Sequence, residues 1–182
     1  MKKTRNRVAD LIDLVHEGGD WDLTALHDLA ERAARATLAY LDLPAAEYEI
    51  ACLACNDARI AELNAQFRAK AVPTNVLSWP AWDLSAEEDG GLPDLPPEGD
   101  PEDPESLGNI ALAYETCLRE ALDQDKASSA HLLHLVVHSV LHLLGYDHIR
   151  DKDAALMEET EIAILASMGV QNPYDLGAGV PS

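Results

Sequence analysis

The feature that most constrains how this chain can fold is a nearly all-apolar stretch that histidines interrupt at regular intervals. Residues 131–145 contain nine leucines and valines, so the stretch is predicted to form a buried helix. At about 100° per residue, four histidines fall on one face of that helix. They are His131, His134, His138 and His142. Because a buried row of imidazoles needs partners, this face must meet hydrogen-bonding groups or an ion.

The end of this helix has the spacing of a metal site. His138 and His142 are one helical turn apart, so their rings can converge on a single ion. Gly145 is a natural helix terminator, and the chain can then turn back and bring His148 to the same ion. We expect these three histidines to bind one Zn²⁺ per chain, with a fourth position open to water, whose pKa the ion would lower to about 7.

An alternative is that the histidines are core residues satisfied by hydrogen bonds. This is the better interpretation of a single histidine on an apolar face, but here five of the seven histidines lie within 18 residues. The clustering favours the metal site. His134 is expected to pack near the ligands or to hydrogen-bond to one of them.

The same spacing occurs in the metzincin proteases, which makes a peptidase a rival prediction. In those enzymes a glutamate follows the first histidine and activates water. Here that position is Ser139, which cannot take a proton at neutral pH. Peptide hydrolysis by that mechanism is therefore not expected.

The pattern of apolar residues and turn signals predicts an α+β fold. Strands are expected at residues 8–15, 48–52, 76–79 and 107–112, although periodicity leaves the first ambiguous between strand and helix. Helices are expected between Asp22 and Pro44, after a cap at Asn56 or Asp57 with Ile60, Leu63 and Phe67 on the apolar face, and at 114–125, 129–144 and 151–167. The result is a small mixed sheet of about four strands packed by helices, with the histidine-rich helix in the C-terminal half.

Acidic residues are concentrated in one segment. Residues 83–105 contain ten Asp or Glu, no Lys or Arg, and five of the ten prolines. We expect a mobile loop inserted into a single domain that spans residues 1–182. A net charge of -20 argues against a nucleic-acid partner, but half of it lies in this loop, and a local basic cleft remains compatible with the rest.

The remaining composition indicates a cytoplasmic protein. Three cysteines, no recognisable export signal and no long apolar segment favour free thiols in a reducing compartment and no membrane partner. Cys52 and Cys55 form a C-x2-C pair, but a structural zinc site needs a second pair. Buried thiols on a strand are expected instead.

The motif His138-Ser-Val-Leu-His-Leu-Leu-Gly-Tyr-Asp-His148 resembles the signature of the YbeY endoribonucleases, a family of bacterial ribosomal RNA maturation factors. Residues 63–70 and 73–80 resemble a second block of that family, and residues 107–110 a third. The likeness covers about residues 47–170 apart from the acidic loop.

This resemblance implies a metal-dependent endoribonuclease specific for single strands, acting in ribosomal RNA processing, 16S rRNA 3′ end maturation and ribosome quality control. Ribosomal RNA and the small ribosomal subunit are the implied partners; DNA is not expected, and the oligomeric state stays open. Arg68 matches the family's functional arginine, and its guanidinium can bind the scissile phosphate. The alternative is a surface arginine at a helix end. Lys70 either extends the positive patch or is an ordinary solvated lysine.

Several points stay open at this level. Water activated by the ion, or a base acting on the RNA 2′-hydroxyl, can each begin the reaction. Tyr146 and Asp147 either transfer protons or form the turn that orients His148. Ser139 and Asn109 stand where the family usually has Gly and Asp, and Asn109 cannot act as a base. A ribosome assembly factor that uses zinc only structurally is a further alternative.

Overall fold

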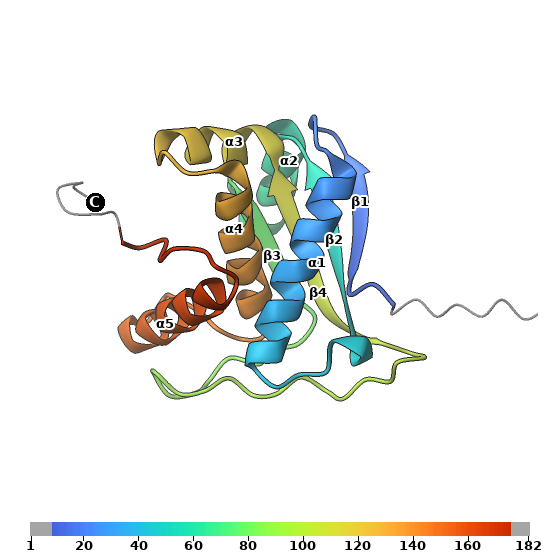
Figure 1. Ribbon diagram of the computed structural model, residues 1–182, viewed down its shortest axis with the longest axis vertical. Helices are drawn as coiled ribbons and strands as arrows, with labels where there is room; N and C mark the ends of the chain where they lie inside the picture. The colour runs from blue at the N-terminus through green and yellow to red at the C-terminus, as the bar shows by residue number, and fades with distance from the viewer. Residues whose placement is uncertain (1–8, 176–182) are drawn as a thin grey trace, which may run out of the picture.

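The computed structural model describes residues 9–175 and contains a four-stranded sheet (Figure 1). The strands are β1 (Ile12–Glu17), β2 (Tyr48–Cys55), β3 (Val76–Pro80) and β4 (Glu105–Ala113), in the spatial order β1-β2-β4-β3. Strands β1, β2 and β4 are parallel, whereas β3 pairs with β4 in the antiparallel sense. The predicted mixed sheet is confirmed, and the acidic segment connects the two antiparallel strands β3 and β4.

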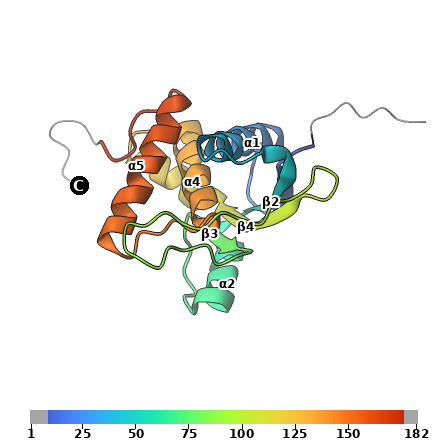
Figure 2. The same ribbon diagram turned by 90° about the horizontal axis from the view of Figure 1, so that it is seen from below.

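Helices cover both faces of the sheet (Figure 2). They are α1 (Leu23–Tyr40), α2 (Asp57–Arg68), α3 (Tyr114–Asp123), α4 (Ser128–Leu143) and α5 (Asp151–Ser167), with a short 3₁₀ turn at Ala45–Glu47. Helices α1 and α4 lie against one face and form the larger core, whereas α2 lies on the other face over a smaller core. The predicted α+β fold is therefore confirmed.

Two helices begin at the residues that the sequence predicts. The Asp22 side chain accepts a hydrogen bond from the Ala25 N–H at 3.1 Å, and Asn56 accepts one from the Arg59 N–H at 2.8 Å. These caps satisfy backbone donors that the first helical turn leaves unpaired. Helix α2 ends at Arg68, and its C-cap residue Ala69 has a left-handed φ of 54° that turns the chain towards β3.

Other expectations need correction. The first strand begins at Ile12 rather than at residue 8, which lies outside the described residues. Phe67 was expected on the buried face of α2, but its side chain is 62% exposed and meets Trp79 edge-on, with ring centroids 5.5 Å apart. Cys52 and Cys55 are buried free thiols on β2, as predicted.

The acidic segment 83–105 contains no helix and joins β4 only at its last residue, as expected for a loop. It runs from β3 past α5 and back to β4 (Figure 1). Contrary to expectation, it buries surface and is attached to the rest of the fold. Leu84 is buried, and the Arg150 guanidinium donates hydrogen bonds to the carbonyl oxygens of Ala86 at 2.8 Å and Glu87 at 2.9 Å.

Candidate metal centre

Helix α4 is buried along most of its length, and its histidines separate into two groups. His131 lies in the core, where its Nε2 atom is 3.0 Å from Oε1 of Glu120 on α3. His134, His138 and His142 instead line an open cleft. The predicted row of histidines is therefore divided: His131 belongs to the core, and the other three belong to the candidate site.

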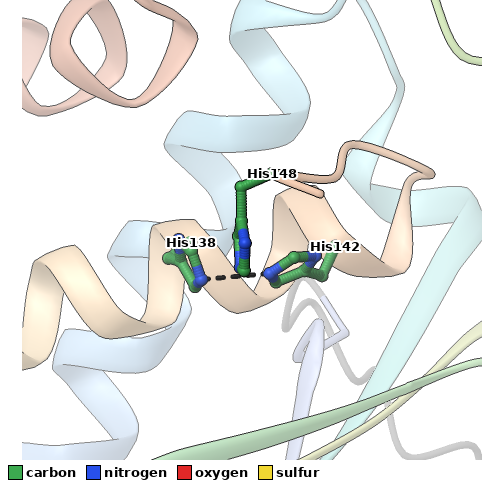
Figure 3. A group of neighbouring side chains, drawn as sticks. All are labelled: His138, His142 and His148. Carbon is green, nitrogen blue, oxygen red and sulfur yellow. Dashed lines mark hydrogen bonds between the residues drawn. The ribbon is translucent and has the colours of Figure 1, made fainter. Parts of the chain in front are cut away.

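His148 reaches this cleft from the loop after α4 (Figure 3). Gly145 has a φ of +94°, a left-handed conformation that glycine adopts without a steric penalty, and the chain reverses direction there. The backbone N–H of His148 then donates to Oδ1 of Asp147 at 2.7 Å, which fixes the turn. This contact fits the turn that orients His148, one of the two roles left open for Asp147.

The three predicted ligands converge. His138, His142 and His148 each offer a ring nitrogen, and these atoms lie within 4.8 Å of one another. Figure 3 shows His148 reaching from the loop after α4 towards the two α4 rings. The ring centroids of His138 and His142 are 4.5 Å apart, and the centroid of His148 lies 4.9 Å from that of His142 and 5.5 Å from that of His138.

The hydrogen bonds of these rings fit a cation. Nδ1 of His142 lies 2.9 Å from the carbonyl oxygen of Tyr146, so this nitrogen carries the proton and donates. Nδ1 of His138 likewise faces a carboxylate oxygen of Glu161 at 2.6 Å. The two Nε2 atoms, 3.0 Å apart, therefore present lone pairs to each other. Such an arrangement is repulsive unless a proton or a cation lies between the two atoms, so the pair could hold a metal ion.

Electrostatics keep His142 ready to bind a metal. Burial lowers the pKa of His142 to about 4, and the neighbouring His138 and His148 act in the same direction. The ring is therefore neutral near pH 7. Since only the neutral imidazole binds a metal, little proton competition is expected at this position.

Glu161 on α5 is a site residue that the sequence analysis missed. It is 1% exposed and contacts both His138 and His134. Burial disfavours its charged form, but hydrogen bonds from His134 and His138 outweigh this and lower the pKa of Glu161 to about 2. A signal did exist, because Glu161 shares the buried face of its helix with Met157, Ile164 and Leu165.

The cleft around the histidines has a volume of about 1060 Å³ and lies along the outer edge of β3. Arg68 and Lys70 line it, as do the carboxylates of Asp83 and Asp147. Arg68 is exposed, and its Nη2 atom donates to the carbonyl oxygen of Ser78 at 3.3 Å. The structure thus brings the predicted arginine into the same cleft as the three histidines.

The two departures from the family pattern lie outside this cleft. Ser139 is fully buried, and its hydroxyl donates to the carbonyl oxygen of Leu135 at 2.8 Å. Asn109 is exposed on β4, where alternation with the buried Ile110 places it on the face opposite α4. An Asp at position 109 would therefore point away from the histidines.

An α+β fold with three convergent histidines and a guanidinium in one open cleft defines a class, the candidate metal-dependent hydrolases. Comparison with known proteins then narrows this class. The model of the family described as Endoribonuclease YbeY matches residues 14–169. The chain therefore belongs to the YbeY family.

Individual relatives support the same family. A Ruegeria protein named Endoribonuclease YbeY is 51% identical over 169 residues, which cover 93% of this chain and 99% of the relative. A protein of the same name from Cereibacter sphaeroides is 55% identical over 164 residues, covering 90% and 98%. A solution structure from Thermotoga maritima covers 93% of this chain and all of its own, with a TM-score of 0.50 at 19% identity. This last likeness concerns the fold alone.

A membrane-spanning helix must be long and apolar throughout. None of the helices among residues 9–175 is both long and apolar enough to cross a bilayer.

Proposed function

We propose that this protein is a zinc-dependent endoribonuclease that cuts single-stranded segments of ribosomal RNA. Its place would be the cytoplasm, during processing of the 16S rRNA 3′ end, maturation of the small ribosomal subunit and ribosome quality control. The observation that carries the proposal is the convergence of three histidines in a cleft that also holds Arg68. Relatives about half identical to this chain and named endoribonucleases support RNA as the substrate.

Each site residue has a task in this proposal. His138, His142 and His148 would bind one zinc ion, which supplies a Lewis acid and lowers the pKa of bound water. Arg68 would bind the phosphate that is to be cut. Its contact with Ser78 uses one of five N–H donors, so the guanidinium can still bind phosphate oxygens in a bidentate manner. Negative charge that develops on those oxygens would be offset there.

The distribution of charge is compatible with RNA in spite of a net charge of -20. Among the residues that line the cleft, the cations Arg68 and Lys70 equal the carboxylates in number. The acidic excess lies elsewhere, to a large part in residues 83–105. With few cations in the cleft, RNA binding should depend strongly on each of them.

The neighbourhood of Ser139 speaks against the peptidase alternative. In the metzincin proteases, the glutamate at this position must reach the water beside the ion. Here its hydroxyl is buried and bound to Leu135, so it points away from the cleft. We therefore do not propose peptide hydrolysis.

Elemental analysis and RNA cleavage together test the proposal. The purified protein should contain close to one zinc per chain and should cut a single-stranded fragment of precursor ribosomal RNA. His142→Ala and chelation should abolish both properties. A folded wild-type protein that takes up no metal would overturn the proposal. A zinc-loaded protein that does not cleave RNA would favour the alternative of a ribosome assembly factor. Hydrolysis of casein would favour the peptidase alternative.

A cellular experiment tests the ribosomal role. Cells depleted of this protein should accumulate ribosomal RNA precursors, including 16S rRNA with an unprocessed 3′ end. The wild-type gene should restore processing, whereas His142→Ala should not. Normal processing in the depleted cells would contradict the proposed substrate.

A further inference from the structure

Glu161 is a buried carboxylate that joins α5 to the candidate metal centre. It projects from the middle of α5 and is 1% exposed. Its Oε1 atom lies 2.6 Å from Nδ1 of His138, and its Oε2 atom lies 3.0 Å from Nε2 of His134. The hydroxyl of Tyr174 also donates to Oε2. Burying a carboxylate is costly unless donors surround it, and this group has three.

These donors come from two separate parts of the chain. His134 and His138 lie one turn apart on α4, whereas Tyr174 belongs to the segment after α5. Burial raises the pKa of the Tyr174 hydroxyl, and the hydrogen bond to Glu161 acts in the same direction, so this group remains a donor. The carboxylate is therefore held in place from both sides.

The consequence for His138 is a fixed ring. A carboxylate at Nδ1 requires the proton there, which leaves the lone pair on Nε2, the atom facing His142. The same contact prevents rotation of the ring and makes Nε2 more basic. The two predicted ligands on α4 differ in the partner of their Nδ1 atom. This atom contacts a carboxylate in His138, but the neutral carbonyl of Tyr146 in His142.

We propose that Glu161, held by His134 and Tyr174, is a positioning residue that orients His138 and strengthens its binding to the metal. This inference rests on the proposed metal site, but it assigns a role to residues of α5 and the C-terminal segment that lie outside the histidine motif. Glu161 does not touch the ion in this arrangement, because both of its oxygens bind hydrogen-bond donors.

Zinc affinity, measured by competition with a chromogenic chelator, tests the proposal. Glu161→Gln keeps the shape of the side chain but removes its charge. We expect its zinc affinity to fall about 10-fold to 100-fold. Tyr174→Phe removes one supporting hydroxyl and should cost less, about threefold. Glu159→Gln, at an exposed position of the same helix, is the matched control and should bind zinc as the wild type does.

A spectroscopic measurement separates positioning from general stabilisation. In Co²⁺-substituted protein, the visible absorption bands should change in Glu161→Gln but not in Glu159→Gln. In the wild type, the Nδ1 proton of His138 should give a slowly exchanging, low-field NMR signal, which Tyr174→Phe should weaken. These readouts follow the ligand itself, so a loss of stability alone would not alter them.

The outcomes are distinct. Wild-type protein without zinc would contradict the proposed metal site. Tight zinc binding by the wild type together with unchanged affinity in Glu161→Gln and Tyr174→Phe would overturn the role of Glu161. Two zinc ions per wild-type chain would also overturn it, because a second ion would replace the hydrogen bonds of Glu161. If Glu161→Gln does not fold, the affinity of Tyr174→Phe and the NMR signal decide.

Discussion

Gly145 packs directly against the backbone of Leu84, so the acidic segment touches the turn that leads to His148. A Cβ atom added at Gly145 would lie 2.6 Å from the carbonyl carbon of Leu84 and 2.7 Å from its oxygen. Leu84 is itself buried. The position of the third histidine thus depends on a segment whose composition alone would suggest a free loop.

Gly145→Ala should be strongly destabilising. The φ of +94° disfavours any side chain, and the backbone of Leu84 leaves no room for one. Together these effects should lower the free energy of unfolding by about 3 kcal/mol. Gly169→Ala is the matched control, since its φ is +76° but nothing lies within 4 Å of the added atom. Urea unfolding should show a loss of only about 1 kcal/mol there, and equal losses would contradict the role of Leu84.

Arg150→Ala should loosen the acidic segment. The guanidinium binds the carbonyl oxygens of Ala86 and Glu87, but it is 40% exposed, so the loss should be only about 1 kcal/mol. Limited digestion with a glutamate-specific protease should show faster cleavage after Glu87. Arg32→Ala, at an exposed position of α1, is the control. Equal cleavage rates in both variants would mean that Arg150 does not hold the segment.

The histidine motif could be predicted because its geometry is local. Helical periodicity places His138 and His142 on one face, and Gly145 brings His148 back within a few residues. The strands and helices were found for the same reason, since caps such as Asp22 and alternating apolar residues act over short distances.

Long-range contacts were not predictable in this way. Glu161 meets His138 only because α5 packs beside α4, and no spacing in the sequence encodes that angle. The attachment of the acidic segment depends likewise on Arg150, which lies on another element. Arg68 was found through a family resemblance, because its place beside the cleft depends on how β3 lies in the sheet.

The pKa of His142 predicts a pH dependence for the metal-free protein. Burial lowers this pKa from 6.5 to about 4, so the unfolded state binds a proton more readily than the folded state. This stabilising contribution is fully present above pH 6.5 and is lost as the pH falls towards about 4. One pKa unit corresponds to about 1.4 kcal/mol, so the loss should approach about 3 kcal/mol. Urea unfolding between pH 7.5 and 4.5 measures it. His142→Leu should show a flatter profile, and a profile as steep as that of the wild type would assign the effect to other groups.

Arg68→Ala should impair RNA cleavage while leaving the metal site intact. Its guanidinium lies in the cleft, but its hydrogen bond goes to Ser78 and not to a histidine. Removing a donor that stabilises developing charge typically lowers kcat by about 100-fold or more. Arg68→Lys keeps the charge but not the bidentate geometry, so it should recover only part of the rate. Arg59→Ala, on the same helix and paired with Glu17, is the control and should cleave RNA as the wild type does. Zinc content should stay close to one per chain in all three variants. Cleavage by Arg68→Ala at the wild-type rate would leave this residue an ordinary surface arginine.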